Sequence, residues 1–485
     1  MRGNMKVLEE LKPKKVFQYF EEICQIPHGS GNLDRISSYL ECFAKDRNLE
    51  CYRDSSNNVI IIKEATKGYE NVEPIILQGH MDMVAVKKDD SDINLETDAL
   101  KLKVEGDYIF AEGTSLGGDD GIAVAYILAI MDSDDIDHPR IEAVITTDEE
   151  VGMEGASAID LSMLKAKRMI NIDSEEEGIL LTSCAGGARV DSSIPVTFEK
   201  KSGTIVDIEI GGLIGGHSGT EINKERGNAI KFLGFVLREI ANEYNIQIVD
   251  IVGGEKDNAI PRYAKTTIMI NKDHAKSVLN LVNLIEVKLK NENKSKEKDL
   301  FLKAKIGEEK ECNVLTDNST LNIIDYLVLL PNGVVAMSAD IAGLVETSLN
   351  VGILKLNNNE MIASSAIRSS IEISKEKLKM QLEVLAKRFE GTVQIHGDYL
   401  GWQFDPDSKL RALMVDIYEK MFKLEVKIEA LHAGLECGIM ISKIDGLDCV
   451  SYGPNIYDIH TTEERLSISS TERMWNYLLE ILRYK

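Results

Sequence analysis

The 485-residue sequence contains few cysteines, and none of them belongs to a recognisable metal-binding motif. Its seven cysteines are scattered, their number is odd, and no CxxC pair occurs. Zinc sites built from cysteine place their ligands at short, regular spacings, so such a site is poorly supported. Reduced, buried thiols in a cytosolic protein explain this usage better. Any bound metal would therefore need histidine, aspartate and glutamate as ligands.

The sequence also lacks an excess of basic charge and a long apolar segment. Acidic residues number 80 against 56 basic residues, for a formal net charge of −24. Proteins that bind nucleic acids or anionic membranes present a basic surface instead. The longest apolar run, 122–131, is much shorter than the roughly 20 residues that cross a bilayer. The first residues contain no apolar stretch of the signal-peptide kind. We therefore expect a cytoplasmic protein that binds neither nucleic acid nor membrane.

The first part of the chain alternates between segments typical of strands and segments typical of helices. Buried strands are marked by short apolar runs, and helices by apolar residues three and four positions apart. The pattern predicts helices over 16–26 and 121–131 and strands over 58–63, 74–80, 142–150 and 167–176. Such alternation predicts an α/β domain with a mostly parallel central sheet and helices on both faces.

Beyond about residue 190 the pattern changes. A long helix is predicted over 228–244 and an alternating strand over 204–212, which indicates a second, α+β domain. Helix and buried-strand patterns of the first kind return near the C-terminus. We therefore expect a first domain made of residues 1–190 and 398–485, interrupted by a second domain over 191–397.

Clusters of polar residues lie at the ends of predicted strands and at one helix start. They are His80 with Asp82, Asp119 with Asp120, Asp148 with Glu149 and Glu150, then Asp173 and His460. Ligands of open α/β sheets bind outside the carboxyl ends of the strands, so we expect these clusters to share one crevice. Each cluster also has an ordinary explanation, as a hydrogen-bonded pair, a helix cap or a solvated turn.

Taken together, two histidines and several carboxylates predict a metal site. Neutral imidazole and carboxylate suit Zn²⁺, Mn²⁺ or Co²⁺. The acids are too numerous for one tetrahedral ion, but they fit two ions about 3.5–4 Å apart that share a bridging carboxylate. A carboxylate left off the metals would then be the general base for the bridging water.

The order and spacing of these motifs resemble the di-zinc exopeptidase family that includes carboxypeptidase G, aminoacylase and peptidase T. The resemblance covers essentially the whole chain and is closest to the bacterial aminoacyl-histidine (Xaa-His) dipeptidase branch. It rests on GTSLGGDDGIA, TTDEEVGMEGA, GGLIGGHSGTEI, ETSLNVG, SSAIRSS, GWQFDPDS, HAGLECG and HTTEERLSI. It implies a zinc-exopeptidase-like catalytic domain with an inserted α+β lid and dimerisation domain.

The resemblance implies two metal ions, with zinc as the expected metal and cobalt or manganese as alternatives. The ligands would be His80, Asp119 and Asp173 for one ion and Glu150, His460 and the same Asp119 for the other. Asp119 is preferred to Asp120 because the bridging residue of the family is the first of the pair. The bond between these two aspartates resembles one that is cis in relatives.

The resemblance also makes Glu149 the general base and Asp82 the residue that orients His80. Two cations would polarise the scissile carbonyl, while Glu149 would take a proton from the shared water and deliver it to the leaving amine. Glu149 must stay off the metals, whereas Glu150 binds one of them. Adjacent residues of a strand point to opposite faces, so an extended backbone here would explain how the two glutamates separate.

Five further residues resemble substrate-binding residues of the family. His217 would stabilise the oxyanion from across a homodimer interface formed by the lid domain. Arg368 would bind the C-terminal carboxylate of the substrate. Asn258, His432 and Glu436 would line the substrate pocket. Without the resemblance, a loop histidine and a surface arginine remain the ordinary interpretations of the first two.

We therefore expect a cytosolic metallo-dipeptidase that hydrolyses unblocked dipeptides, with β-Ala-His among the candidate substrates. One alternative is a tripeptidase or an N-acyl-amino-acid amidohydrolase of the same family. An alternative of another class is a metal-binding or peptide-binding protein without turnover. The complete ligand set and the intact Glu149 argue against this last alternative, and hydrolysis assays separate all three.

Overall fold

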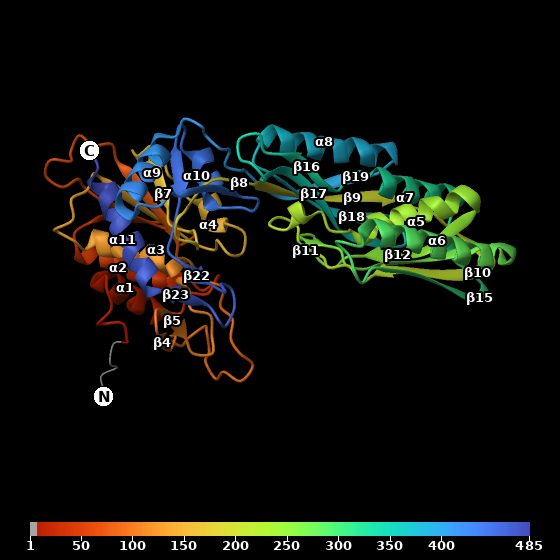
Figure 1. Cartoon of the computed structure of the whole chain (residues 1–485), viewed down its shortest axis with the longest axis horizontal. Coiled ribbons are helices and arrows are strands. Elements are labelled where there is room, and N and C mark those ends of the chain that lie inside the picture. Colours follow the sequence, from red (N-terminus) through yellow and green to blue (C-terminus); the bar gives the residue numbers. More distant parts are fainter. Residues whose placement is uncertain (1–6) are drawn as a thin grey trace. The chain divides into compact units, whose positions relative to one another are not determined.

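The computed structural model describes residues 7–485 and consists of two compact units (Figure 1). The first unit contains the chain up to Ser183, Trp402–Ala430 and Leu435–Lys485, and the second contains Cys184–Gly401 and Leu431–Gly434. These limits lie a few residues from the positions expected at 190 and 397. The short segment Leu431–Gly434, which belongs to the second unit, is not visible in the sequence pattern. The start of the chain, to which the signal-peptide expectation applies, lies partly outside the described residues.

An eight-stranded sheet forms the centre of the first unit, in the order β1-β2-β6-β3-β7-β21-β8-β20. Its strands are β1 (Glu50–Arg53), β2 (Val59–Lys63), β3 (Ile75–His80), β6 (Ile141–Thr146), β7 (Arg168–Asn171), β8 (Ile179–Cys184), β20 (Lys427–Leu431) and β21 (Asp448–Ser451). The central strands β6, β3, β7 and β21 are parallel. The predicted α/β class with a parallel central sheet is therefore confirmed.

The strands outside this centre run antiparallel to their neighbours. β1 pairs antiparallel with β2, β2 with β6, and β21 with β8. A short turn joins β1 to β2, and so short a connection permits only an antiparallel pair. Strand identity was readable from apolar runs, but strand direction was not.

Helices cover both faces of this sheet. One face shares an apolar core with α1 (Lys14–Cys24), α2 (Asp34–Asp46), α3 (Gly118–Met131), α9 (Lys409–Phe422) and α11 (Ile468–Arg483). Alternate strand residues such as Leu77 and Ala143 point into this core. The adjacent residues point to the other face, where Gln78 meets the first residue of α10 (Glu436–Lys443). Every residue of α3 from Asp120 onward is buried, as predicted for the helix over 121–131.

A small antiparallel sheet of the first unit brings together two segments that are distant in sequence. It has the order β22-β23-β5-β4, with β4 (Leu102–Glu105), β5 (Tyr108–Ala111), β22 (Ile456–Tyr457) and β23 (Arg465–Ser467). Because β23 pairs with β5, the loop between β22 and β23 lies near the loop that follows β5. The first loop carries His460, and the second leads to Asp119.

The second unit is an α+β structure, as predicted. Its nine-stranded sheet has the order β15-β10-β14-β12-β17-β18-β9-β19, with β16 beside β17, and its pairings are antiparallel. The strands are β9 (Gly186–Pro195), β10 (Phe198–Gly211), β12 (Ile246–Gly253), β14 (Ala264–Ile270), β15 (Phe301–Leu315), β16 (Gly333–Met337), β17 (Val345–Leu356), β18 (Glu360–Ser369) and β19 (Thr392–Tyr399). The helices are α5 (Ala229–Glu243), α6 (Ala275–Asn293), α7 (Asp317–Leu329) and α8 (Glu372–Arg388).

The helices of the second unit pack on one face of its sheet. Ile208 and Ile210 of β10 point into the shared apolar core, while the intervening Asp207 and Glu209 are not buried. The other face of the sheet is therefore polar at Asp207 and Glu209. Within residues 7–485, no helix is both long enough and apolar enough to cross a membrane.

The described residues contain no disulfide bond, and the cysteines differ in burial. Cys24, Cys437 and Cys449 are buried, whereas Cys42 is exposed. The expectation of buried thiols therefore holds for part of the set only.

Candidate metal centre

Residues from several segments of the first unit meet at the carboxyl ends of its central strands. His80 ends β3, Glu150 lies in the turn after β6, and Asp173 follows β7. These three strands are adjacent and parallel, so their ends lie at the same edge of the sheet. Asp119 lies in the first turn of α3, and His460 lies in the loop between β22 and β23. We call these five residues the metal cluster.

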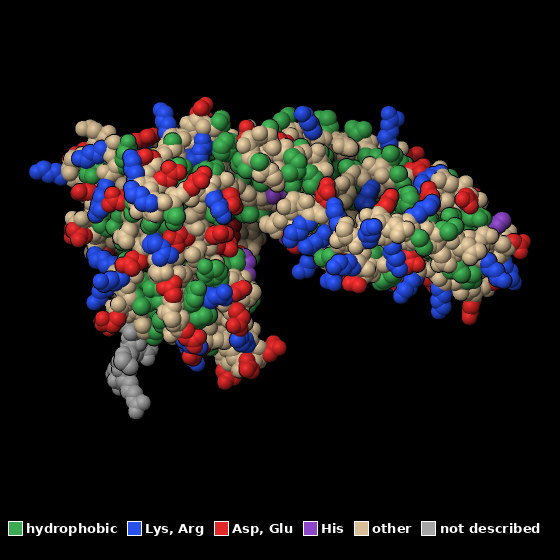
Figure 2. All heavy atoms as spheres, in the orientation of Figure 1, with side chains coloured by type: hydrophobic (Ala, Val, Ile, Leu, Met, Phe, Trp, Pro, Cys, Tyr) green, Lys and Arg blue, Asp and Glu red, His purple; other side chains and the backbone are tan. Residues whose placement is uncertain are grey.

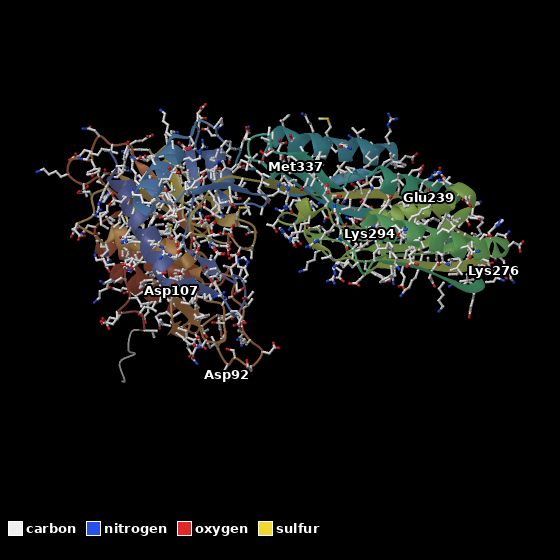
Figure 3. All side chains as sticks on the ribbon, viewed as in Figure 1. Asp92, Asp107, Glu239, Lys276, Lys294 and Met337 are labelled. Carbon is white, nitrogen blue, oxygen red and sulfur yellow. The ribbon has the colours of Figure 1, made fainter. Side chains whose placement is uncertain are left out.

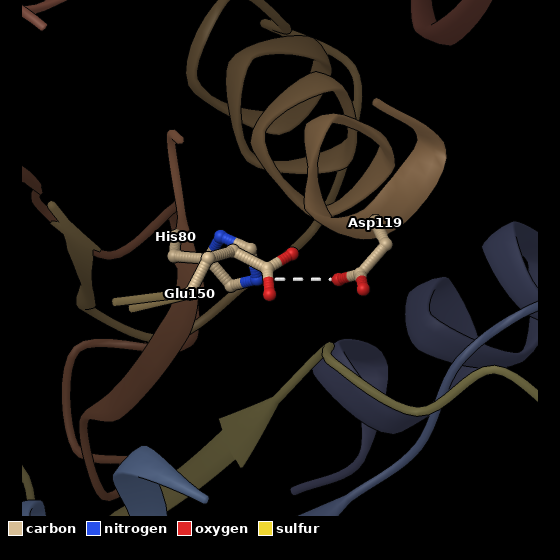
Figure 4. Close-up of side chains that lie close together, drawn as sticks. All are labelled: His80, Asp119 and Glu150. Carbon is tan, nitrogen blue, oxygen red and sulfur yellow. Dashed lines mark hydrogen bonds and ion pairs between the residues drawn. The ribbon is translucent and has the colours of Figure 1, made fainter. Parts of the chain in front are cut away.

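The two carboxylate oxygens of Asp119 face different imidazoles. Oδ1 lies 3.2 Å from His80 Nε2, and Oδ2 lies 3.2 Å from His460 Nε2. His80 Nε2 also lies 3.6 Å from Asp173 Oδ1, while His460 Nε2 lies 2.9 Å from Glu150 Oε1. Figure 4 shows His80, Asp119 and Glu150 converging from a strand end, a helix start and a turn. This arrangement suits a carboxylate that bridges two cations.

Asp120 lies close to the same cluster but points elsewhere. Its ligand atoms fall within 4.8 Å of those of His80 and Asp173. However, Asp120 Oδ2 accepts a hydrogen bond from the backbone N–H of His80, at 3.2 Å. The bond between Asp119 and Asp120 is cis, as the resemblance implied. Asp119 faces both imidazoles, so the geometry favours Asp119 as the bridging residue.

These residues fit a pair of divalent cations. Asp119, Glu150 and Asp173 form ion pairs with the two imidazoles, and no lysine or arginine of the described chain pairs with them. Three carboxylates that lack such a partner repel one another, so added positive charge would stabilise them. Imidazole and carboxylate are also the donors that suit zinc, manganese or cobalt.

The pKa shifts in the metal cluster also show that its carboxylates stabilise positive charge. Burial, together with the charges of Asp119 and Glu150, raises the pKa of Asp173 to about 6. Hydrogen bonds to Asp119 and Glu150 raise the pKa of His460 to about 10. Burial lowers the pKa of His80, but the surrounding carboxylates outweigh this effect and raise it well above its ordinary value. Cations would therefore compete with protons for this cluster.

Asp82 connects His80 to the turn that carries the two glutamates. Its Oδ1 lies 3.5 Å from His80 Nδ1, but the nearest acceptor of that ring nitrogen is the Asp82 carbonyl oxygen, at 3.0 Å. The carboxylate accepts hydrogen bonds from the backbone N–H groups of Glu149 and Glu150, at 3.1 and 3.4 Å. Asp82 thus faces the ring through both its backbone and its side chain.

Glu149 and Glu150 do not lie on an extended strand, so the expectation of alternating faces was wrong. β6 ends at Thr146, and the Glu149 carbonyl accepts hydrogen bonds from Gly152 N and Met153 N, both at 2.9 Å. The two glutamates therefore occupy a turn, in which strand alternation does not apply. Burial, helped by nearby negative charges including Glu150, raises the pKa of Glu149 well above its ordinary value.

Glu436 is placed differently from the pocket position that its motif suggested. Its side chain is 0% exposed and lies beneath the ends of β3 and β6. Thr146 Oγ1 donates to Glu436 Oε2 at 2.6 Å, and Gln78 Nε2 donates to the same oxygen. Burial raises its pKa to about 7. A side chain with no exposed surface supports the strand ends and does not line a pocket.

The other predicted substrate residues gather within the second unit. A Cβ atom placed on Gly219 would lie 2.6 Å from His432 O, 3.0 Å from Arg368 Nε and 3.0 Å from His217 Cε1. These three residues therefore surround Gly219, and we call them the arginine cluster. The Asn258 carbonyl accepts a hydrogen bond from Ser218 N at 2.9 Å, which places this residue beside the same loop.

Arg368 has no ion-pair partner among residues 7–485, and its Nε atom is buried without a hydrogen-bond partner. Its Nη1 donates to Tyr399 Oη at 3.4 Å. Burial and the charge of Arg368 lower the pKa of His432 to about 3 and also lower that of His217. Both imidazoles are therefore neutral, and the cluster carries one unpaired positive charge.

Two further residues of this environment were not predicted from the sequence. Tyr399 contacts Arg368, and Ser348 Oγ lies 2.8 Å from His432 Nε2. Both residues belong to or adjoin motifs that carried the resemblance, but no chemical pattern in those motifs marked the hydroxyl groups. Only the pairing of β17 with β18 brings Ser348 opposite Arg368.

Comparisons with known proteins agree over the length of the chain. Residues 76–484 match the family model described as peptidase family M20/M25/M40. The chain is 36% identical to the cytosol non-specific dipeptidase of Escherichia coli, over 99% of both sequences. Its structure resembles that of aminoacylhistidine dipeptidase from Vibrio alginolyticus, with a TM-score of 0.93, 34% identity and coverage of 99% and 98%. Aminopeptidase PepT of Bacillus cereus shares the fold at 16% identity, with a TM-score of 0.55 and coverage of 97% and 98%.

Proposed function

The chain belongs to peptidase family M20/M25/M40, and we propose that it is a cytosolic metallo-dipeptidase acting on unblocked dipeptides. The observation that carries this proposal is the position of Asp119 between His80 and His460. The relatives named for dipeptide hydrolysis match nearly the whole chain, which supports the same reaction here. Substrates of the Xaa-His type, including β-Ala-His, are the first to test.

The proposed ligands form two sets that share Asp119. His80 and Asp173 complete one set, and Glu150 and His460 complete the other. Zinc is the proposed metal, with cobalt and manganese as alternatives, because all three suit these donors. When bound, such cations polarise a carbonyl and lower the pKa of a water molecule.

Glu149 is the proposed general base. It accepts a proton from the attacking water at its carboxylate and donates that proton to the leaving amine. Burial raises the pKa of Glu149 above its ordinary value, and a raised pKa makes its carboxylate a stronger acceptor for the proton of the water. Asp82 supports the base by accepting its backbone N–H, at 3.1 Å, while also facing His80.

His217 is the proposed donor to the oxyanion. Its Nδ1 accepts hydrogen bonds from the backbone N–H groups of Gly219 and Thr220, at 3.3 and 3.2 Å. A nitrogen that accepts hydrogen bonds carries no proton, so a neutral His217 must carry its proton on Nε2. That N–H is the donor an oxyanion requires.

Arg368 is the proposed binding residue for the C-terminal carboxylate of the substrate. Its unpaired charge and unsatisfied Nε support this role, since a guanidinium binds a carboxylate through two parallel hydrogen bonds. Asn258 and His432 remain the proposed pocket residues beside it. Glu436 is not retained as a pocket residue because it is fully buried.

A homodimer formed through the second unit is also proposed. This unit carries most of the exposed large hydrophobic side chains of the described residues. They include Ile373, Met380 and Val384 on α8, and Figure 2 shows apolar side chains gathered over that helix. Met337 of β16, labelled in Figure 3, is 50% exposed. Exposed apolar surface of this kind favours association with a second copy.

The test is a hydrolysis assay on protein that has been stripped with a chelator and reloaded with zinc, manganese or cobalt. Unblocked dipeptides should release free amino acids only after reloading. Tripeptides and N-acetylated amino acids, assayed in parallel, identify the alternative activities of the family. If reloaded protein binds two ions and hydrolyses none of these substrates, the proposed function is wrong and a binding protein without turnover remains.

A further inference from the structure

Glu464 is a buried carboxylate that no catalytic or ligand role includes. Its side chain is 3% exposed, and it lies at the end of the loop that carries His460. Its oxygens accept hydrogen bonds from four successive backbone N–H groups, those of Leu116 at 2.8 Å, Gly117 at 3.1 Å, Gly118 at 2.8 Å and Asp119 at 3.4 Å. One carboxylate thus binds the whole backbone segment that leads into Asp119.

This contact replaces an ordinary helix cap. The first N–H groups of a helix have no partner within the helix, and a side chain near its start commonly accepts them. The residue before α3, Gly117, has no side chain, and its φ of 70° lies in the left-handed region. The acceptor therefore comes from Glu464, a residue distant in sequence. A Cβ atom on Gly118 would lie only 3.3 Å from Glu464 Oε1, so the backbone fits closely around the carboxylate.

The same two segments are also joined by the small sheet. β23, which begins directly after Glu464, pairs with β5, and Arg465 lies opposite Phe110. The His460 loop and the Asp119 loop are therefore held together at the sheet and again at Glu464. These two loops carry the pair in which His460 Nε2 lies 3.2 Å from Asp119 Oδ2.

We propose that Glu464 is a positioning residue of the metal cluster, which holds the bridging Asp119 at a set distance from His460. The inference rests on the proposed metal centre, because it assigns Glu464 a role only through those two ligands. Replacing a residue that hydrogen-bonds to a metal ligand commonly weakens metal binding by about 10- to 100-fold. A residue that merely caps a helix would change stability without changing metal affinity.

Glu142 provides a matched control in the same unit. It is 0% exposed, against 3% for Glu464, and its carboxylate accepts backbone N–H groups from Lys165 and Ala166, at 2.9 and 3.0 Å. It therefore resembles Glu464 in burial and in accepting backbone N–H groups, and it differs in its ion pair with Arg140, at 2.9 Å. The N–H groups that it accepts belong to a loop that precedes β7 and contains no proposed ligand.

The experiment titrates metal-free protein with Zn²⁺ and with Co²⁺, for the wild type, E464Q and E142Q. Glutamine keeps the size of the side chain but turns one acceptor into an NH₂ group that faces backbone N–H groups. We expect E464Q to bind the ion of the Asp119, Glu150 and His460 set about 10- to 100-fold more weakly. The Co²⁺ absorption spectrum of that site should change as well. E142Q should lose thermal stability and keep both affinities.

Two results would overturn the proposal. If E464Q binds both ions with wild-type affinity, Glu464 only caps the helix. If E142Q loses as much metal affinity as E464Q, the loss comes from general destabilisation. E464D, with a shorter reach, should lie between E464Q and the wild type. If neither Glu464 variant folds while E142Q does, Glu464 serves folding and the proposal fails.

The outcome is independent of the proposed peptidase activity, because the titrations use no substrate. A wild type that binds two ions but hydrolyses no dipeptide would refute the proposed function and leave this comparison intact. A wild type that binds no ion would refute the metal centre, and with it the role of Glu464.

Discussion

The metal cluster of the first unit and the arginine cluster of the second unit have opposite electrostatic characters. In the metal cluster, carboxylates gather without a lysine or arginine partner in the described chain and raise the pKa values of His80 and His460. In the arginine cluster, Arg368 has no carboxylate partner among the described residues, and burial together with its charge lowers the pKa values of His217 and His432. The same residue type, histidine, is thus driven toward opposite charge states.

This difference shows what each cluster can bind. An acidic cluster with imidazoles recruits cations, whereas neutral imidazoles beside an unpaired guanidinium recruit anions. The proposed reaction would use both properties, because cations activate a carbonyl and a guanidinium binds a terminal carboxylate. A substitution in one cluster should therefore test one of these two properties at a time.

The largest effect is expected from E149Q, which leaves the metal cluster intact and removes its proposed base. kcat should fall by about 10²- to 10⁴-fold, because glutamine cannot accept the proton of the water. Metal content, measured by atomic absorption, should remain at the wild-type value. The exposed Glu154 supplies the control, since E154Q should keep full activity. Near-normal turnover by E149Q would remove Glu149 from the mechanism.

A smaller effect is expected from R368A, which removes the positive charge of the arginine cluster. kcat/KM for dipeptides should fall by about 10- to 100-fold, the range for losing hydrogen bonds to a charged group. The variant should also stop discriminating between a dipeptide and its C-terminal amide. R238A, which breaks the surface pair with Asp325, is the matched control. If R368A still rejects the amide, another group binds the carboxylate.

Mixing two inactive variants tests whether the clusters of different subunits cooperate. H217A lacks the proposed oxyanion donor, and E149Q lacks the base. If His217 acts across a homodimer, subunit exchange should restore roughly a quarter of wild-type activity, because half of the dimers are mixed and each has one intact site. Light scattering would establish the dimer. A mixture that exchanges subunits and stays inactive would show that His217 acts within its own subunit or not at all.

The smallest expected effect is on the pH dependence of the free energy of unfolding, to which the neutral His432 contributes. Its pKa of about 3 lies below the ordinary value of 6.5, so the unfolded chain binds a proton that the folded chain does not. Stability from this residue is therefore present above pH 6.5 and is lost as the pH falls toward 3. From pH 7 to pH 5, the wild type should lose about 2 kcal/mol more than H432Q. Urea unfolding at both pH values measures this difference, and equal losses would contradict the shift.

Part of the fold was predictable because apolar patterns are local. The buried helix over 121–131 and the strands that end near His80, Thr146 and Asn171 appeared as apolar runs. The crevice at the strand ends followed from a general property of parallel sheets. The antiparallel outer strands did not, because the direction of a strand depends on its connections and leaves no mark in its own composition.

The errors at the site have a common origin. Glu149 and Glu150 were expected on a strand, but the chain turns after Thr146, and hydrogen bonds to the Glu149 carbonyl define that turn. Glu436 was expected in a pocket, but α10 places it beneath the strands. Glu464 had no expected role, although it binds the loop of Asp119. In each case the position of the glutamate depends on a hydrogen bond to the backbone or to a residue distant in sequence, and neither is visible in the pattern around the glutamate.

The sequence by itself determined which chemical groups this protein has, their order, and the apolar runs that build the two units. These follow from residue type and from spacing over a few positions. Only the tertiary structure decided that both oxygens of Asp119 face an imidazole, that Glu436 is sealed from solvent, and that Glu464 holds a helix start from a distant loop. Burial and hydrogen-bond partners arise from contacts between distant segments, and such contacts exist only once the chain has folded.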